Sequence, residues 1–160
     1  LSWPLSSILI TSPYGPRWGR FHYGLDFRAS VGTPVSAMAE GVVEGIGDTD
    51  IACKGASFGK WVFIKYKNGL SSTYAHLSAI TATVGQSVKV GDVVGLSGNT
   101  GSSTAAHLHV VVHASTGVKV DTVPSKSCGG KVFTQPITAL SAYLSPILYL
   151  PKTTANMYKK

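Results

Sequence analysis

Short apolar stretches alternate with polar or small residues between positions 35 and 112. Such patterns occur in PVSAMAEGVVEGIG, WVFIKYKNGLSSTYAHL, SVKVGDVVGLSGNTG and HLHVVVH. A period of two is typical of strands, and the glycines between these stretches supply turns. Short strands at regular spacing favour an antiparallel sheet or barrel over alternating strand–helix units. We therefore predict an all-β fold, mainly an antiparallel sheet core with few short helices, in a single domain.

Three local signals add detail to this prediction. Asn68-Gly69 lies between two strand patterns and predicts a hairpin with a two-residue turn, because both central positions of the favoured turn need positive φ. The stretch TQPITALSAYLSPILYLP predicts a short helix over about residues 137–144, opened near Pro136 and ended before Pro146. The polar tail from Lys152 onward is expected to be frayed.

Composition agrees with one β-rich domain. The chain has 160 residues, of which 44% are hydrophobic and 13% are charged. That apolar fraction is enough for a core and excludes disorder as the main description. The 18 glycines and 8 prolines, with few strong helix formers, disfavour a large helical protein.

Charge and hydropathy argue against two classes of partner. The formal net charge is +7, but the 14 Lys and Arg are scattered rather than gathered on one element. We therefore predict no nucleic-acid binding, since that function usually concentrates basic residues on one element. A diffuse positive surface suits weak attraction to a polyanion, including a bacterial wall that bears teichoic acids. No apolar run reaches the roughly 20 residues that a bilayer-spanning helix needs, so we predict no membrane-spanning segment.

The first residue and the two cysteines give information on processing of the chain and on the cellular compartment in which it folds. The chain starts at Leu1 without a basic region or a cleavage-site pattern, which we interpret as a processed or excised segment. Cys53 and Cys128 lack the CxxC spacing of a zinc knuckle or redox site. Both lie in polar or Gly- and Ser-rich segments, where a single disulfide between them and two free thiols are equally compatible with the sequence. A disulfide would indicate an oxidising compartment.

The first pair of candidate metal ligands is His22 and Asp26, in HYGLDF. In an extended or bent segment, positions 22, 24 and 26 share one face, and Gly24 leaves room for an ion between imidazole and carboxylate. Taken alone, HxxxD is a weak signal for a metal site.

The HLH sequence supplies a second pair. Alternation sends His107 and His109 to the same face of a strand, while Leu108 enters the other. A cation or a shared catalytic water would explain two adjacent imidazoles, and a pair of half-exposed strand histidines is the alternative. His76, in STYAHLS, reads as an ordinary strand-end histidine when seen alone. Catalytic zinc takes three protein ligands and leaves a fourth position for water, so two His and one Asp satisfy the count and two further His can act on the substrate.

Five stretches in this order and spacing carry a family resemblance: SPYGPRWGRFHYGLDF, TPVSAMAEGVV, TYAHLS, VGQSVKVGDVVGLSGNTGSST and HLHV. Together they resemble the LytM or lysostaphin-type zinc metallopeptidases, peptidase family M23, which cut peptide bonds in bacterial peptidoglycan. The resemblance runs from about Thr11 to Asp121. It implies an antiparallel β core with the ligands on the floor of a groove bordered by loops.

The resemblance also implies roles for individual residues. His22, Asp26 and His109 would hold Zn²⁺, and His76 and His107 would be the catalytic histidines. The implied reaction is amide hydrolysis by a metal-activated water, with general acid–base work on the two catalytic histidines. It further implies peptidoglycan as the partner and a secreted or cell-envelope location, and we expect a monomer.

The chain departs from the family pattern in several places. Ala105-Ala106 and Val110-Val111 flank HLH where family members commonly have Gly-Pro and Phe-Glu, which suggests a different groove wall. Residues 1–121 would form the catalytic domain. Residues 122–160 would form an extension packed on the core, and a Cys53–Cys128 bridge could tie the two together.

Other polar and aromatic residues receive weaker predictions. We expect His113 to have a structural or surface role, and Asp48 and Asp50 to lie in a solvated loop rather than a calcium site, because the other ligands are absent. The aromatic residues around the first ligand, Trp18, Phe21 and Tyr23, would either line the groove or pack beneath it.

Two other functions share features with this sequence. A degenerate LytM-like domain would bind the wall or regulate a partner hydrolase without cutting, but such domains typically lose metal or catalytic residues, and all five positions are occupied here. A biotinyl or lipoyl carrier domain shares the VKVGDVVG style of turn. It needs a lysine at its hairpin tip, and SGNTG has none.

Overall fold

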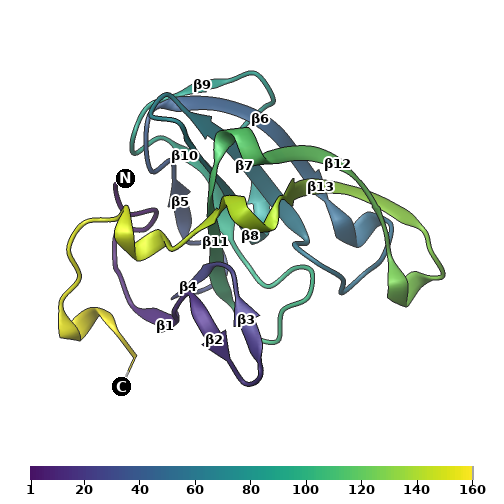
Figure 1. Cartoon of the computed structure of the whole chain (residues 1–160), viewed down its shortest axis with the longest axis horizontal. Helices are drawn as coiled ribbons and strands as arrows, with labels where there is room; N and C mark the ends of the chain where they lie inside the picture. Colours follow the sequence, from purple (N-terminus) through teal and green to yellow (C-terminus); the bar gives the residue numbers. More distant parts are fainter. Residues whose placement is uncertain (160) are drawn as a thin grey trace.

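The computed structural model describes residues 1–159 as strands joined by turns and short 3₁₀ helices, and it contains no α-helix in that range (Figure 1). The strands are β1 (Ile10–Ser12), β2 (Gly15–Arg17), β3 (Arg20–His22), β4 (Leu25–Arg28), β5 (Pro34–Ser36), β6 (Gly41–Asp48), β7 (Lys60–Tyr66), β8 (Leu70–Ile80), β9 (Ser87–Val88), β10 (Val93–Ser97), β11 (His107–Ala114), β12 (Val118–Pro124), β13 (Val132–Thr138) and β14 (Tyr143–Leu144). The 3₁₀ helices are η1 (Thr49–Ile51), η2 (Ser115–Gly117), η3 (Lys126–Cys128), η4 (Leu140–Ala142), η5 (Pro146–Leu148) and η6 (Ala155–Met157).

One antiparallel sheet organises the domain. Its strand order is β1-β4-β11-β8-β7-β6-β9, with β10 bridging β5 and β8 and with β14 beside β11. Two small hairpins, β2–β3 and β12–β13, stand outside this sheet. The predicted fold class, a mainly antiparallel all-β core in a single domain, is confirmed.

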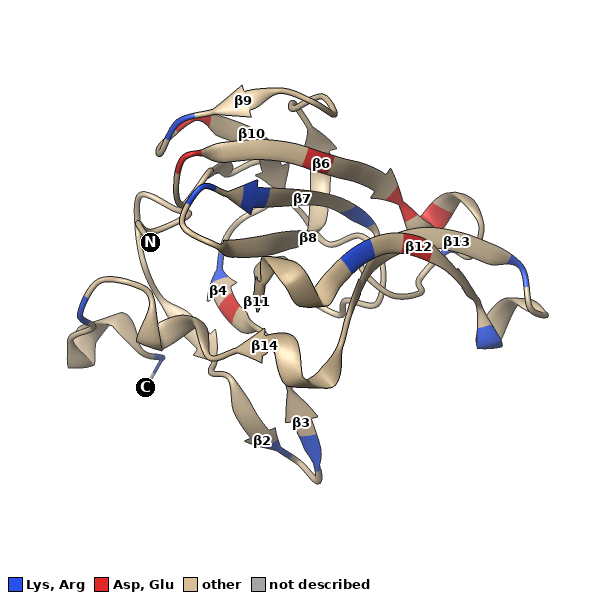
Figure 2. Ribbon diagram, turned by 45° about the horizontal axis from the view of Figure 1, so that its top comes forward, with Lys and Arg blue, Asp and Glu red and all other residues tan. Residues whose placement is uncertain are grey.

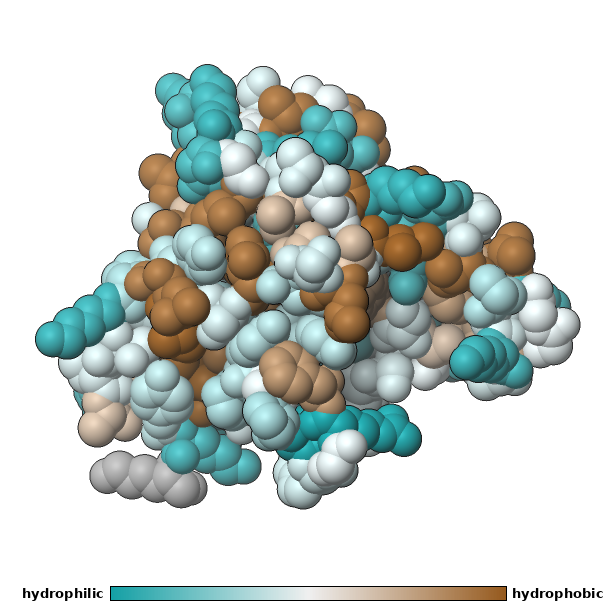
Figure 3. Space-filling model, viewed as in Figure 1, coloured by the Kyte–Doolittle hydropathy of each residue, from teal (hydrophilic) through white to brown (hydrophobic). Residues whose placement is uncertain are grey.

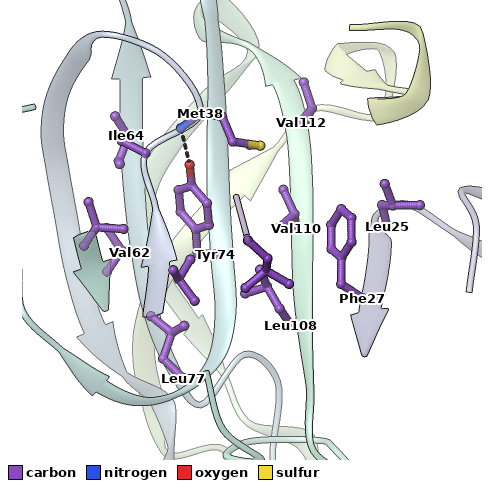
Figure 4. Packing of buried hydrophobic residues seen from close by; sticks show 14 of the residues in the cluster. Leu25, Phe27, Met38, Val62, Ile64, Tyr74, Leu77, Leu108, Val110 and Val112 are labelled. Atoms are coloured by element: carbon purple, nitrogen blue, oxygen red, sulfur yellow. Dashed lines mark hydrogen bonds between the residues drawn. The ribbon is translucent and has the colours of Figure 1, made fainter. Parts of the chain in front are cut away.

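The period of two along β11 separates the core from the opposite face. Leu108, Val110 and Val112 are fully buried in the main hydrophobic cluster, where they pack with residues of β4, β7 and β8 (Figure 4). Within that cluster the buried Tyr74 hydroxyl accepts a hydrogen bond from the backbone N–H of Met38, 3.0 Å away, so its polar atom has a partner.

The other face of the sheet is covered at one end by the β12–β13 hairpin. Val118 of this hairpin packs with the buried Trp61 and Phe63 of β7. The indole Nε1 of Trp61 also donates to the carbonyl oxygen of Thr134, 3.2 Å away. A disulfide between Cys53 and Cys128 closes the far end of the hairpin onto the loop that follows η1.

The β7–β8 hairpin forms at the predicted place but with a different turn. Three residues, Lys67 to Gly69, join the strands, and only Gly69 has positive φ, at 86°. Asn68 instead uses its side-chain oxygen to accept the N–H of Leu70 at 3.0 Å. The predicted two-residue turn is therefore wrong, because this side chain closes a three-residue loop without a left-handed Asn.

The predicted helix over residues 137–144 is also wrong. Residues 132–138 form β13, which pairs along its whole length with β12, and Pro136 stands opposite Val120. Proline is tolerated there because the hairpin is two-stranded and leaves an edge where no N–H is needed. The next residues make η4 and then β14, which pairs with Val112 and His113 of β11.

The C-terminal tail is held against the N-terminal part of the chain as far as residue 159. Tyr158 forms a parallel bridge with Ile10, and the N–H of Lys159 donates to the carbonyl oxygen of Ile10 at 2.9 Å. This differs from the frayed end expected from Lys152 onward, because β1 offers an edge with which the tail can pair. Figure 1 draws both termini on the same side of the molecule.

The expected division after Asp121 falls inside β12, so residues 118–121 share a hairpin with the extension. On the face drawn in Figure 3, apolar side chains are interspersed with polar ones. Across residues 1–159, no helix has the length and apolar character needed to cross a membrane.

Candidate functional site

Neighbouring strands bring the five predicted site residues together. Asp26 of β4 and Ala75 of β8 both stand opposite His109 of β11, so His76 and His109 come from adjacent strands. His107 lies two positions before His109 on the same face, and His22 ends β3. Side-chain alternation on β11 and the strand order therefore bring residues from distant parts of the sequence to one place.

His22, Asp26 and His109 present three converging donor atoms. All three ligand atoms lie within 4.8 Å of one another. The Nε2 atom of His22 is 3.4 Å from Oδ2 of Asp26, and Nδ1 of His109 is 2.7 Å from Oδ1 of the same carboxylate. Two imidazole nitrogens and one carboxylate oxygen match the donors that zinc takes in catalytic sites. The donor set therefore fits a divalent metal such as zinc.

Backbone carbonyls orient three of the imidazoles. Nδ1 of His22 donates to the carbonyl oxygen of Pro13 at 2.8 Å, which leaves the lone pair of Nε2 directed toward Asp26. Nδ1 of His76 donates to Thr100 at 2.7 Å, and Nδ1 of His107 donates to Ala105 at 2.8 Å. Because a carbonyl oxygen can only accept, each contact fixes the ring and places the free lone pair on Nε2.

His76 and His107 form a pair beside the three donors. Their ring centroids are 4.9 Å apart, and Nε2 of His107 is 3.7 Å from Oδ1 of Asp26. His76 has a left-handed backbone, with φ of 60°, and its N–H donates to the carbonyl oxygen of Phe58 at 2.7 Å. A non-glycine residue in this conformation is strained, and such strain is concentrated at functional sites.

Burial and neighbouring charges set the ionisation of the site. Burial lowers the pKa of His76 to about 4, and the adjacent His109 adds to this effect, so His76 is neutral near pH 7. Burial opposes ionisation of Asp26, but the contacts of its carboxylate with His109 and His22 lower its pKa well below the usual range. The site therefore holds an ionised carboxylate beside the neutral imidazole of His76, and an ionised carboxylate is the form that binds a cation.

Gly24 is required by the close approach of His109. A Cβ atom at position 24 would lie 2.4 Å from Cε1 and 2.8 Å from Nε2 of that imidazole, and 2.7 Å from the carbonyl oxygen of Val110. The sequence-based interpretation that Gly24 leaves room for an ion between the imidazole and the carboxylate is not confirmed. The space is occupied by the ring of His109.

The site lies on the floor of an open groove of about 580 Å³. Arg17 and Trp18, at the end of the β2–β3 hairpin, stand on one side, and residues 102–106, including Ala105 and Ala106, form another wall. Trp18 is 90% exposed and lines the groove, whereas Phe21 and Tyr23 pack with each other at a centroid distance of 4.7 Å. Of the three aromatic residues around the first ligand, only Trp18 lines the groove, and the exposed Phe21 does not pack beneath it.

Three groove residues received no role from the sequence. Arg17 donates to Ser12 Oγ at 2.6 Å and lies 3.4 Å from Oδ2 of Asp26. Arg28 and Lys159 also line the groove. Strand alternation from Asp26 would have found Arg28, two residues later on the same face, but nothing in the sequence marks Lys159.

The remaining candidates lie outside the groove. His113 is fully buried between the hydroxyls of Ser71 and Thr73, which agrees with a structural role. Asp48 pairs with Lys60 at 3.1 Å, and Asp50 accepts N–H groups from the loops around it, so the two acids hold the loop structure rather than lying free in solvent.

Comparison with known proteins identifies the family. The sequence model described as peptidase family M23 matches residues 20–122, a segment that contains all five site residues. The chain belongs to peptidase family M23. Among curated M23-like relatives, the DD-carboxypeptidase/endopeptidase Mpg of Neisseria meningitidis serogroup B is 41% identical over 113 residues, covering 66% of this chain and 24% of that protein. The chain thus spans about a quarter of the length of the curated relatives it matches first.

Solved structures of M23-like peptidases show the same fold. The catalytic domain of lysostaphin, an antimicrobial peptidase from Staphylococcus simulans, superposes with a TM-score of 0.64 at 29% identity, covering 86% of this chain and 88% of that domain. A zinc-containing peptidase from Vibrio cholerae gives a TM-score of 0.60 at 31% identity, covering 69% of this chain and 35% of that protein.

Proposed function

We propose that this protein is a zinc-dependent endopeptidase that hydrolyses peptide bonds in bacterial peptidoglycan, either in a cross-bridge or in a stem peptide. The observation that carries the proposal is the convergence of His22, Asp26 and His109 on one point, with two further histidines beside it, on the floor of an open groove. Membership of family M23 supports a peptidase. We further propose that it acts as a monomer in the cell envelope or outside the cell.

The same three residues would hold the zinc ion. Their donor types fit it, and the Pro13 carbonyl keeps Nε2 of His22 available. Bound zinc supplies a Lewis acid that polarises a peptide carbonyl and lowers the pKa of a water molecule. The low pKa of Asp26 keeps its carboxylate ionised for this role.

His76 and His107 would perform the proton transfers. Each ring has its Nδ1–H bound to a carbonyl oxygen, so each presents Nε2 to the groove. In hydrolysis, a proton leaves the attacking water as its oxygen bonds to the carbonyl carbon, and a proton reaches the leaving nitrogen as the C–N bond breaks. Two imidazoles 4.9 Å apart, centroid to centroid, are placed to hold and return that proton.

The groove itself suits a peptide substrate. It is open along the surface rather than closed, and it lies between the β2–β3 hairpin and the loop of residues 102–106. An extended chain can therefore enter without displacing a covering segment. The exposed indole of Trp18, which lies over the guanidinium of Arg17 at 5.2 Å, offers an apolar surface beside the reacting centre.

Digestion of purified sacculi tests this proposal. The protein is incubated with sacculi of several cross-bridge types, with zinc or with a chelator, and the released fragments are analysed by mass spectrometry. We expect chelator-sensitive release of fragments with new amino and carboxyl ends. Release that is unchanged by the chelator, or by His107→Ala, would contradict the proposal.

Two variants separate metal binding from catalysis. His109→Ala should lose bound zinc, as measured by elemental analysis of the dialysed protein. It should also lose activity in the digestion of sacculi. His107→Ala should retain zinc while activity falls roughly 100-fold or more, the usual contribution of a general acid–base group.

The other candidate is a non-cutting domain that binds the wall or regulates a partner hydrolase. The unusual flanks of HLH, Ala105-Ala106 and Val110-Val111, are the observation in its favour. Zinc binding together with cosedimentation on sacculi, but with no release from any wall type, would support this candidate over the peptidase.

A further inference from the structure

More basic than acidic side chains line the groove. Its charged residues are Arg17, Arg28, Lys159 and Asp26, so Asp26 is the one acidic side chain of residues 1–159 that lines it. The carboxylate of Asp26 is already engaged by His22, His109 and Arg17. Two basic side chains, Arg28 and Lys159, remain, and neither has an ion-pair partner in the described part of the chain.

The backbone holds Arg28 and Lys159 on one edge of the site. The N–H of Arg28 donates to the carbonyl oxygen of Leu9 at 2.8 Å, and the N–H of Lys159 donates to that of Ile10 at 2.9 Å. Two cations are therefore attached to neighbouring residues of one segment. Arg28 also stands opposite His107 in the β4–β11 pairing, which connects this edge directly to the proposed catalytic pair.

Arg28 also lies where two hollows meet. It lines the groove and, on its other side, a second hollow of about 290 Å³ whose wall includes the hydroxyl-bearing Ser6, Ser7, Ser30 and Thr33. A substrate that extends from the site past His107 would thus meet a guanidinium and then a surface that combines these hydroxyls with the apolar Leu5, Leu9 and Ala29. The guanidinium and the hydroxyls can bind an anionic, hydrogen-bonding group, and the apolar residues can pack against the chain that carries it.

Charged residues are also present over the rest of the molecule. In Figure 2, basic residues are spread over β2, β3, β7, the β12–β13 hairpin and the C-terminal end, and acidic residues lie mainly along β6 and beside β12, with one on β4. Glu40 on the far side is neutralised by Lys67, 2.8 Å away. Basic residues are therefore present over the whole molecule, and Arg28 and Lys159 are set apart because both line the groove.

We propose that Arg28 and Lys159 form a carboxylate-binding subsite that selects stem peptides with a free carboxylate near the cleaved bond. This inference rests on the proposed peptidase function, because it names the substrate class of the same groove. Arginine binds a carboxylate through two parallel N–H donors, and a nearby lysine adds charge. Stem peptides carry such carboxylates on their acidic and diamino residues, whereas the interior of an all-glycine bridge has none.

A matched pair of peptides tests the subsite. Both are synthetic cross-linked stem peptides, identical except that the carboxylate of the diamino residue is free in one and a carboxamide in the other. Their dissociation constants are measured by calorimetry with the zinc-loaded His76→Ala full chain, in which cleavage is expected to be slow. We expect the free carboxylate to bind about fivefold to tenfold more tightly than the carboxamide.

Substitutions in the same background assign the preference to residues. Arg28→Gln and Lys159→Gln should each reduce the preference, the double substitution should bring it close to one, and Arg28→Lys should restore part of it. Lys126→Gln removes the same charge from η3, outside the groove, and should leave the preference unchanged. Equal binding of the two peptides, no measurable binding of either, or a preference that survives the double substitution would overturn the inference.

Cleavage of the same peptides distinguishes this inference from the proposed function. Cleavage of both peptides at equal rates and with equal affinities would leave the peptidase in place and remove the subsite. A binding preference without cleavage by the zinc-loaded wild-type chain would support the subsite and remove the peptidase.

Discussion

The Nδ1 atom of His76 donates a hydrogen bond to the carbonyl oxygen of Thr100 across 2.7 Å. The hydroxyl of Thr100 is held in turn, because it accepts the N–H of Lys60 at 3.0 Å. The N–H of the next residue, Gly101, donates to Oδ2 of Asp50 at 3.1 Å. The orientation of His76 therefore depends on loops outside the strand that carries it.

Asp50 is expected to act as a positioning residue for His76. Its Oδ1 accepts the N–H of Gly55 at 2.9 Å while Oδ2 accepts that of Gly101, so one carboxylate joins two loops. Asp50→Ala should loosen the Thr100 carbonyl and lower kcat about tenfold, with little change in KM, because the imidazole is less well placed. Steady-state kinetics on a soluble peptide substrate measures both constants.

A matched aspartate controls for general loop effects. Asp92 similarly accepts a backbone N–H, that of Lys89 at 2.9 Å, but in an exposed turn away from the groove. Asp92→Ala should leave kcat unchanged, and both variants should retain bound zinc. An equal loss of kcat in the two variants, or loss of zinc in Asp50→Ala, would contradict a positioning role.

Gly24→Ala should weaken metal binding while the chain still folds. The added Cβ would meet the His109 ring at 2.4 Å and the backbone carbonyl oxygen of Val110 at 2.7 Å, so β11 must shift together with the ring; Gly24 has no positive φ that would add further strain. Displacement of one ligand ring should reduce zinc affinity roughly 10- to 100-fold, comparable to the loss of an orienting contact. Competition with a chromogenic chelator measures the affinity, and a thermal melt of the metal-free chain checks folding. Unchanged zinc affinity would show that the ring can move aside.

Alternation along strands accounts for the part of the site that the sequence could predict. His107, Leu108 and His109 lie on the faces expected from a period of two, and the family resemblance named residues that the sheet brings within contact. Arg28 was predictable by the same alternation from Asp26. Lys159 was not, because it reaches the groove only through pairing of the tail with Ile10, a contact between the two ends of the chain.

The wrong predictions have a common physical origin in tertiary pairing. Residues 137–144 have helical spacing, but the first two of them pair with β12 and the last two pair with β11. Local propensity is a weak preference that such pairing overrides. At Asn68 the sequence located the hairpin correctly, and only the side-chain hydrogen bond to Leu70 decided the turn geometry.

Removing the disulfide should destabilise the domain by on the order of 2–4 kcal/mol, since the bond closes a long loop. Cys53 and Cys128 are separated by 75 positions, and the bond joins the loop after η1 to the tip of the β12–β13 hairpin. Urea unfolding of the wild type, with and without reductant, compares the free energies of unfolding. The variant with both cysteines replaced by serine should have the same free energy of unfolding as the reduced wild type. Adding reductant should not change its stability. Equal stability of the oxidised wild type and this variant would contradict the prediction.

His113 should make the stability of the fold depend on pH. Its imidazole lies between the hydroxyls of Ser71, 2.6 Å from Nδ1, and Thr73, 3.1 Å from Nε2, and it packs against the ring of Phe63. None of these neighbours carries a charge that could stabilise an imidazolium. Burial therefore lowers the pKa of His113 to about 4, against 6.5 for an ordinary histidine.

The sign of the effect follows from proton binding. Between about pH 6.5 and pH 4 the unfolded chain takes up a proton at His113 and the folded chain does not, so stability falls as the pH falls through this range. The loss should approach on the order of 3 kcal/mol. His113→Gln should be less stable at pH 7.5, because the buried hydroxyls lose part of their bonding, but it should lose less stability on acidification. Urea unfolding of both proteins between pH 7.5 and pH 4 measures the difference, which cancels the titration of other groups. A constant difference across that range would mean that His113 accepts its proton in the folded chain as readily as in the unfolded one.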